Sequence, residues 1–308
     1  MTSQASITLG AVSNDLAQVV AQAASAIVGV HTRDRLPSSG VIWREGVIVT
    51  AAHTVRHEEG IEITLPDGRR VAAELAGVDT GTDLAVLKTA SAKPTVLERS
   101  DTGALRVGEL AIAVARLGEH GVSASLGVIG GLSGAWRTWR GGHVERLIRV
   151  AITLYPGFSG GALLDAHGRM IGLNTAGLAR SGAIALPPST VDRVADELLA
   201  KGYIARPYLG VAFQSVRLPD PIQQKLNLGR AAGVIVLSVE QGGPAERAGV
   251  MVGDVLWSFH GQPVRDTADV QHALGAEPIG RTVDATVVRG GELVTLQITP
   301  GERPRRSH

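Results

Sequence analysis

Pro156-Gly157-Phe158-Ser159-Gly160-Gly161 places one serine among three glycines. Glycine backbones adopt conformations that let neighbouring amides converge on one point. A serine hydroxyl becomes an effective nucleophile only when a base removes its proton, and the oxyanion formed on the attacked carbonyl needs backbone N–H donors. Ser159 and the amides of Gly157 and Ser159 provide these groups. Taken alone, the stretch is equally typical of a glycine-rich hairpin turn.

A histidine and an aspartate upstream complete the set of groups that such a serine needs. His53 lies at the end of an apolar run, and Asp83 lies just before the β-rich run Leu84–Lys88. Taken singly, each has a structural explanation, as a histidine at a strand edge and as a turn former. In the order His53, Asp83, Ser159 they match a base, an orienting carboxylate and a nucleophile.

Short β-rich runs punctuated by glycine, aspartate and proline surround these three residues. The 308 residues include 39 glycines and 14 prolines, and aromatics make up only 3%, so aliphatic side chains must form the core. A first series comprises Ile27–His31, Val41–Trp43, Gly46–Thr50, Ile61–Leu65, Arg70–Leu75 and Leu84–Lys88. A second comprises Leu110–Ala115, Ala124–Ile129, Leu147–Ala151, Gly161–Leu164, Met170–Leu173 and Gly182–Leu186. Two series of about six strands predict two antiparallel barrels or sandwiches, with the catalytic groups in the crevice between them.

Helical spacing occurs at both ends of this β region. Ser13 or Asn14 is a candidate cap for a helix reaching about Ala26, so residues 1–26 are expected to form an N-terminal helical segment. Thr190–Lys201 also has helical spacing and ends at Gly202, a typical C-cap. The first domain is therefore assigned to residues 27–203 and a linker to residues 204–207.

A smaller domain is expected at residues 208–300, followed by a disordered tail at 301–308. Its strands are predicted at Val211–Val216, Gly233–Val239, Val255–Phe259, Arg281–Arg289 and Glu292–Thr299, with one helix at Thr267–Leu274. The basic run Arg303–Arg306 in the tail is interpreted as a solvated terminus.

Charge and composition exclude several classes of function. A formal charge of +1 offers no electrostatic case for a nucleic-acid partner. The absence of cysteine excludes disulfides, thiol catalysis and cysteine metal sites, and no cofactor or metal is implied. No stretch approaches the roughly 18 to 20 apolar residues of a membrane span. Met1–Gly10 lacks the features of a signal peptide, so a cytoplasmic location is expected if Met1 is the native start, and an extracytoplasmic one if it is not.

Three segments together resemble the catalytic blocks of chymotrypsin-like serine proteases, and most closely those of the HtrA/Deg family. They are Thr50–His53, Thr82–Leu87 and Gly157–Gly161, and the flanking segments Ser39–Ile42 and Ile171–Ala176 agree. The resemblance implies a mainly β protein with a chymotrypsin-like double β-barrel. It also implies His53 as general base, Asp83 as its orienting group, Ser159 as nucleophile, and the Gly157 and Ser159 amides as the oxyanion hole.

The resemblance further implies a substrate pocket without an acidic residue at its base. Its expected lining residues are Leu154, Leu173, Asn174, Thr175 and Leu178. Such a pocket favours cleavage after small or medium aliphatic residues, with shallow discrimination among them.

The smaller domain resembles a PDZ domain of the same family. Tyr208-Leu209-Gly210-Val211 is similar to the loop that binds a peptide's C-terminal carboxylate. A bound peptide C-terminus would pair along Val211–Val216 as an extra strand, beside the helix Thr267–Leu274. Val270 and Leu274 either line that groove or pack into the core.

The predicted function is serine endopeptidase action on unfolded or misfolded polypeptides, with PDZ binding regulating activity through the loop Gly131–His143. Phe158 departs from the family pattern, which usually has asparagine there, and Ala51-Ala52 replaces Asn-Asn or Asn-Ala. The alternative is therefore a weakly active or dormant protease acting as a peptide-binding quality-control or scaffold protein. The resemblance also implies homotrimers, although no aromatic residue precedes Trp43.

Three rival interpretations use some of the same residues. Gly157-x-Ser159-x-Gly161 matches the nucleophile elbow of α/β-hydrolases, whose Ser–Asp–His order Asp254 and His260 would complete. His53 and His57 have zinc-ligand spacing but lack the HExxH glutamate. Trp136–Arg140 suggests base stacking beside phosphate contacts, although a mobile loop explains it better.

Overall fold

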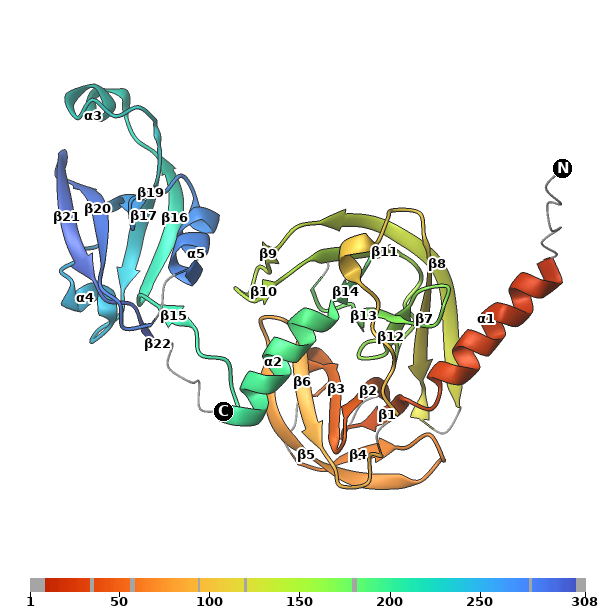
Figure 1. Cartoon of the computed structure of the whole chain (residues 1–308). Coiled ribbons are helices and arrows are strands. Elements are labelled where there is room, and N and C mark those ends of the chain that lie inside the picture. Colours follow the sequence, from red (N-terminus) through yellow and green to blue (C-terminus); the bar gives the residue numbers. More distant parts are fainter. Residues whose placement is uncertain are drawn as a thin grey trace, which may run out of the picture. The chain divides into compact units, whose positions relative to one another are not determined.

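Short Val- and Ile-rich strands form two closed antiparallel barrels in the first of two units, residues 1–204 (Figure 1). The computed structural model describes residues 9–33, 36–55, 59–93, 95–118, 121–178, 182–276 and 279–302. The first barrel comprises β1 Ile27–His31, β2 Ser38–Arg44, β3 Val47–Ala51, β4 Ile61–Thr64, β5 Arg70–Asp79 and β6 Leu84–Lys88, in the order β1-β2-β3-β6-β5-β4. Each predicted strand of the first series therefore exists, within a few residues of its expected ends.

The second barrel contains the second predicted series. It comprises β7 Leu110–Arg116, β8 Val122–Ser133, β11 Leu147–Ala151, β12 Ala162–Leu164, β13 Met170–Thr175 and β14 Ala183–Leu186, in the order β11-β14-β13-β12-β7-β8. Its interior is filled by fully buried side chains such as Ile129, Ile148 and Leu163. The mainly β, double-barrel fold is confirmed.

One apolar cluster joins the two barrels to the helices of this unit. It includes Val49 and Val86 of the first barrel and Ile112 and Leu164 of the second. Helix α2, Pro188–Lys201, contacts β5 and β6 of the first barrel and β13 of the second. Gly202 ends it in the left-handed region, at φ 80°, with its N–H bonded to Leu198 O over 2.8 Å. Short 3-10 turns η1 and η2 span Ala52–Thr54 and Thr102–Ala104.

Two predictions in this unit need correction. Helix α1 runs Leu9–Ala23, so it begins before Ser13 and Asn14, which lie inside it. The segment expected to be a mobile loop contains a hairpin, in which β9 Trp136–Arg137 pairs with β10 His143–Val144. Thr138, between these strands, is buried. The apolar spacing of the sequence did not indicate this hairpin, because its buried side chains are those of Val144 and the hydroxyl-bearing Thr138.

The second unit, residues 205–308, is built around one antiparallel sheet in the order β16-β17-β18-β20-β21. Its strands are β15 Pro207–Tyr208, β16 Val211–Arg217, β17 Ala232–Val239, β18 Val255–Phe259, β19 Gln262–Pro263, β20 Val283–Arg289, β21 Glu292–Ile298 and β22 Gly301–Glu302. Its helices are α3 Asp220–Lys225, α4 Pro244–Arg247 and α5 Thr267–Ala276. Among the described strands, none pairs with the outer side of β16.

The predicted start of the disordered tail, at residue 301, is too early. Gly301–Glu302 form β22 and pair with Pro207–Tyr208, which the sequence assigns to the linker and to the first residue of the domain. The basic run Arg303–Arg306 lies outside the described residues.

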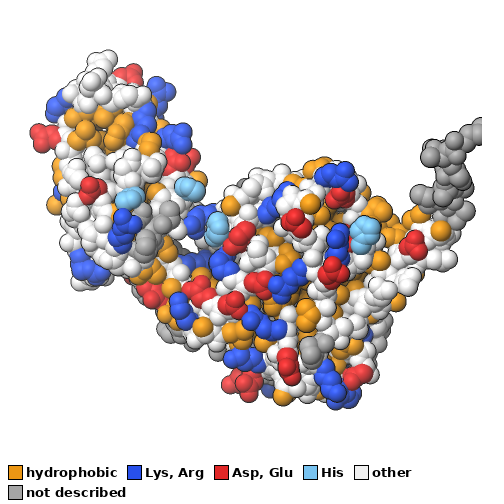
Figure 2. Space-filling model, in the orientation of Figure 1, with side chains coloured by type: hydrophobic (Ala, Val, Ile, Leu, Met, Phe, Trp, Pro, Cys, Tyr) orange, Lys and Arg blue, Asp and Glu red, His pale blue; other side chains and the backbone are white. Residues whose placement is uncertain are grey.

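The surface carries both signs of charge. On the face in Figure 2, Lys and Arg side chains are interspersed with Asp and Glu over both units instead of gathering by sign. No helix among the described residues combines the length and apolarity of a membrane span.

Candidate active site

The turn after β3 and the turn before β6 bring His53 against Asp83. Nδ1 of His53 lies 2.7 Å from Oδ2 of Asp83, and the backbone N–H of His53 donates to Oδ1 over 2.8 Å. Asp83 is fully buried, and the hydroxyl of Thr175 also donates to its Oδ2. The carboxylate therefore sets both the position and the orientation of the imidazole.

The backbone at Asp83 is held in an uncommon conformation. Its φ is 58°, in the left-handed region, which costs energy for a residue other than glycine. The preceding turn is fixed by the buried Asp79, whose carboxylate accepts the N–H groups of Gly81 and Thr82, each over 3.1 Å. Thr138 of the β9–β10 hairpin adds a bond from its hydroxyl to Gly81 O, over 2.7 Å. Asp79 and Thr138 thus support Asp83, although only Asp79 is close to it in sequence.

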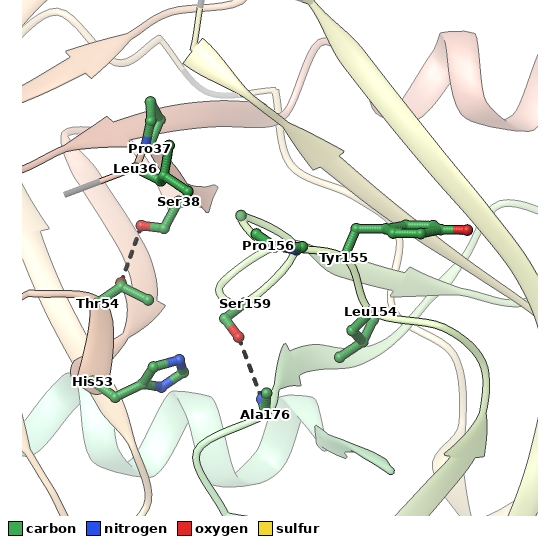
Figure 3. Close-up of a pocket in the computed structure, with 11 residues that line it drawn as sticks. Leu36, Pro37, Ser38, His53, Thr54, Leu154, Tyr155, Pro156, Ser159 and Ala176 are labelled. Carbon is green, nitrogen blue, oxygen red and sulfur yellow. Dashed lines mark hydrogen bonds between the residues drawn. The ribbon is translucent and has the colours of Figure 1, made fainter.

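The serine loop, residues 156–161, places Ser159 on the other wall of the same crevice. Figure 3 shows the Ser159 hydroxyl and the His53 imidazole facing one cavity. The backbone N–H of Ala176 donates to Oγ of Ser159 over 3.3 Å. The cavity holds about 540 Å³ and is lined mainly by apolar side chains, including Leu36, Leu154 and Tyr155. Among the described residues that line it, none is acidic.

The amides of Gly157 and Ser159 have no acceptor among the described residues, whereas other amides of the serine loop do. Phe158 N–H donates to Tyr155 O over 3.1 Å, and Gly161 N–H donates to Phe158 O over 3.1 Å. Gly157 has a φ of 92°, a conformation that favours glycine. The loop therefore leaves two N–H groups, one of them that of Ser159 itself, available to an oxygen atom.

Phe158 does not enter the cavity. Its side chain is 1% exposed and packs in the core of the second barrel, edge-on to Tyr155 with ring centroids 5.9 Å apart. The ring thus anchors the serine loop to the core of the second barrel.

Of the five predicted pocket residues, Leu154 alone lines this cavity. Asn174 is buried and donates its side-chain N–H to Ala162 O, and Thr175 is buried against Asp83. Leu173 and Leu178 pack into the cluster between the barrels. Residue type suggested an apolar pocket, but strand β13 and the segment after it direct these side chains into the protein interior.

Gly177 is a residue whose role the sequence did not reveal. A Cβ at this position would lie 2.5 Å from Oδ2 of Asp83 and 2.7 Å from Nδ1 of His53. Side chains of any size are therefore incompatible with the observed pair. Its proximity to the pair depends on the fold, since nearly a hundred residues separate Gly177 from Asp83.

In the second unit, Tyr208–Val211 lie where β15 turns into the edge strand β16. Leu209 is buried in the core, and Gly210 has a φ of 77°. Helix α5 contacts β16, so an extended peptide has an open strand edge beside a helix. Val270 of α5 is in the core, and Leu274 is half-buried against it, which favours the core role for Val270.

The rival interpretations do not fit the geometry. All strand pairings between named strands are antiparallel, unlike an α/β-hydrolase sheet, and Asp254 is bound by Arg289 within the second unit. His57 lies outside the described residues, and Nδ1 of His53 is bonded to Asp83. The described ranges contain no cluster of three potential metal ligands. Trp136 is half-buried, and Trp139, although 63% exposed, has the guanidinium of Arg140 stacked 4.4 Å from its ring centre.

Comparison with known proteins agrees with this geometry. Residues 38–173 match the trypsin-like peptidase domain, and residues 207–299 match the PDZ domain. A solved HtrA-type protease with a bound tripeptide is 30% identical and has a TM-score of 0.73. The match spans 94% of this chain and 97% of that protease. The chain belongs to the HtrA/Deg family. The crystal structure of a serine endoprotease from Yersinia pestis is 26% identical and has a TM-score of 0.74. The match spans 94% of this HtrA/Deg chain and 98% of the Yersinia chain.

Curated HtrA/Deg relatives are longer than this chain. A probable periplasmic serine endoprotease of DegP-like type from Pseudomonas fulva is 33% identical over 276 residues, which are 87% of this chain and 56% of the relative. A protein of the same description from Rhizobium meliloti is 32% identical over 279 residues, which are 88% of this chain and 54% of the relative. The chain thus spans just over half the length of these relatives. Both are named periplasmic, so they offer no support for the cytoplasmic expectation.

Proposed function

We propose that the chain is a serine endopeptidase in which His53, Asp83 and Ser159 form the catalytic triad. The 2.7 Å bond between Nδ1 of His53 and Oδ2 of Asp83 carries the proposal. It leaves Nε2 as the basic nitrogen on the cavity side of the ring. That nitrogen takes the proton of the Ser159 hydroxyl, and Asp83 stabilises the imidazolium that results.

The attacked carbonyl becomes an oxyanion, for which the free N–H groups of Gly157 and Ser159 are the donors. Two such donors, held in place before the reaction, stabilise charge that appears only in the transition state. The imidazolium then returns its proton to the departing amine, and a water molecule activated by His53 releases the acyl group from Ser159.

The substrates are extended segments of unfolded polypeptide. The cavity is lined mainly by apolar side chains, and its described lining residues offer no carboxylate to bind a basic side chain, so cleavage after Val, Ala, Ile or Leu is expected. A folded protein seldom offers an extended backbone beside an exposed aliphatic residue, whereas an unfolded one does so often.

The second unit binds peptide C-termini by adding them as a strand to β16. The open edge of β16 and the turn at Leu209–Gly210 support this mode. Binding there is proposed to regulate the protease, and the chain is proposed to form a homotrimer in an extracytoplasmic compartment. The names of its periplasmic relatives favour that compartment.

The dormant alternative is not favoured. Its main support was Phe158, but this ring is buried and leaves the cavity and both free amides unobstructed. Casein turnover by the wild-type chain and by Ser159→Ala tests the choice. Degradation that disappears in Ser159→Ala, with an unchanged circular dichroism spectrum, is the expected result. Equal turnover by both proteins would refute the mechanism.

A further inference from the structure

A buried hydroxyl on the first barrel holds the serine loop of the second. Ser39 lies in β2 and is fully buried. Its Oγ donates to the carbonyl oxygen of Gly157 over 2.7 Å and accepts the backbone N–H of Arg116 over 2.9 Å. A longer contact, 3.4 Å, runs to Arg116 O. Because a hydroxyl has one proton, the shorter bond to Gly157 orients it.

The Gly157–Phe158 peptide unit is thereby fixed at both ends. Ser39 holds its carbonyl oxygen, and Tyr155 O accepts its N–H over 3.1 Å. The buried ring of Phe158 fixes the same unit from the core side.

The Ser159–Gly160 peptide unit is fixed in the same way. The backbone N–H of Ser39 donates to Ser159 O over 3.2 Å, and Gly160 N–H donates to Asn174 O over 2.8 Å. One residue of β2 therefore binds the carbonyls of both residues whose amides lack an acceptor among the described residues.

The Pro156–Gly157 peptide unit has no such bond among the described residues, although it carries the Gly157 N–H. Its orientation depends on what holds Gly157. Leu117 and Pro37 crowd this glycine, since an added Cβ would lie 2.3 Å from Leu117 Cδ2 and 2.9 Å from Pro37 O. Within the part of the chain that the structure describes, the one hydrogen bond to Gly157 itself comes from the Ser39 hydroxyl.

We propose that Ser39 is a positioning residue for the oxyanion site: its hydroxyl holds the Gly157 carbonyl against β2 and so keeps the Gly157 N–H directed into the cavity. This inference rests on the proposed protease function. Without the anchor, the glycine rotates among several conformations and presents its N–H only part of the time. Complete loss of one oxyanion donor costs about 10²–10³-fold in kcat, so loss of its anchor is expected to cost about 10- to 100-fold.

The test compares Ser39→Ala with Thr190→Val in the full chain. Thr190 is a matched control because its hydroxyl is equally buried, donates to Glu145 and accepts the Glu145 N–H, yet contacts neither the cavity nor the serine loop. For each variant, kcat and KM are measured on a short chromogenic peptide, and Ki for a peptide boronate, which forms a tetrahedral adduct on Ser159. Thermal unfolding midpoints are recorded in parallel.

In Ser39→Ala, kcat should fall about 10- to 100-fold with KM within about twofold, and the boronate Ki should rise by a similar factor. Thr190→Val should show neither change. A kcat within about twofold of wild type in Ser39→Ala overturns the proposal. The proposal is also overturned if kcat and KM both change in Ser39→Ala and Thr190→Val shows the same changes. If Ser39→Ala fails to fold, Ser39→Cys decides: it keeps the shape of the side chain with a slightly larger and weakly donating thiol, so full activity refutes the role and a partial kcat loss at an unchanged unfolding midpoint supports it.

These outcomes are separate from failure of the protease function itself. That failure would appear as absence of Ser159-dependent turnover in the wild-type chain. Normal wild-type turnover with a fully active Ser39→Ala would refute only the positioning role.

Discussion

Replacing Gly177 by alanine tests how closely the His53–Asp83 pair must be held. The new methyl would lie 2.5 Å from Oδ2 of Asp83, whereas ordinary contacts begin near 3.4 Å, so the pair must move by roughly 1 Å. The backbone at Gly177 is not in the left-handed region, so the substitution adds no conformational strain of that kind. A displacement of about 1 Å in a catalytic group can cost about 100-fold in rate, and we expect a loss of that order in kcat.

The assay is hydrolysis of a short chromogenic peptide under saturating and limiting substrate. Gly134→Ala is the control, since a Cβ there meets nothing within 4 Å and its φ is also not positive. We expect Gly134→Ala to match the wild type and Gly177→Ala to lose kcat with little change in the unfolding midpoint. Full activity in Gly177→Ala would show that the pair tolerates displacement, and would refute the argument from crowding.

Three further predictions follow from the proposed chemistry and from one buried ion pair. Asp83→Asn should lower kcat by roughly three to four orders of magnitude while the fold persists, as judged by circular dichroism; a loss under tenfold would contradict its role. Mass spectrometry of casein digests should show cleavage mainly after aliphatic residues, and cuts mainly after Arg or Lys would contradict the apolar pocket. In the second unit, burial raises the pKa of the Asp254 carboxyl, but hydrogen bonds from Arg289 and from the Met251 N–H outweigh it and hold the pKa below the ordinary 3.8. This group therefore stabilises the fold fully above the ordinary pKa, and the contribution is lost as the pH falls through the lowered value. Asp254→Asn should cost about 1–3 kcal/mol at pH 7, and calorimetry showing the same loss at pH 2 would contradict this linkage.

The strands and the chemically active residues could be predicted from the sequence because both depend on local information. Alternating aliphatic residues between glycine turns indicate strands wherever they occur, and β1, β6, β11 and β18 have the predicted bounds. The order of His53, Asp83 and Ser159, each in a distinctive segment, indicated the candidate triad, two members of which the structure places in hydrogen-bond contact. Helix α1 and strand β22 differed because their ends depend on packing and pairing instead of local preference.

What supports the candidate site was decided by the tertiary structure alone. Ser39, Thr138 and Gly177 act on residues dozens of positions away, through a hydroxyl, a hairpin contact and a missing side chain. Such contacts leave no periodic pattern in the sequence, because they arise only where two barrels close against each other. The pocket prediction failed at Leu173, Asn174, Thr175 and Leu178 for the same reason. Composition makes these residues suitable for a pocket, but the register of β13 with β12 and β14 places Leu173, Asn174 and Thr175 in the protein interior, and Leu178 packs into the cluster between the barrels.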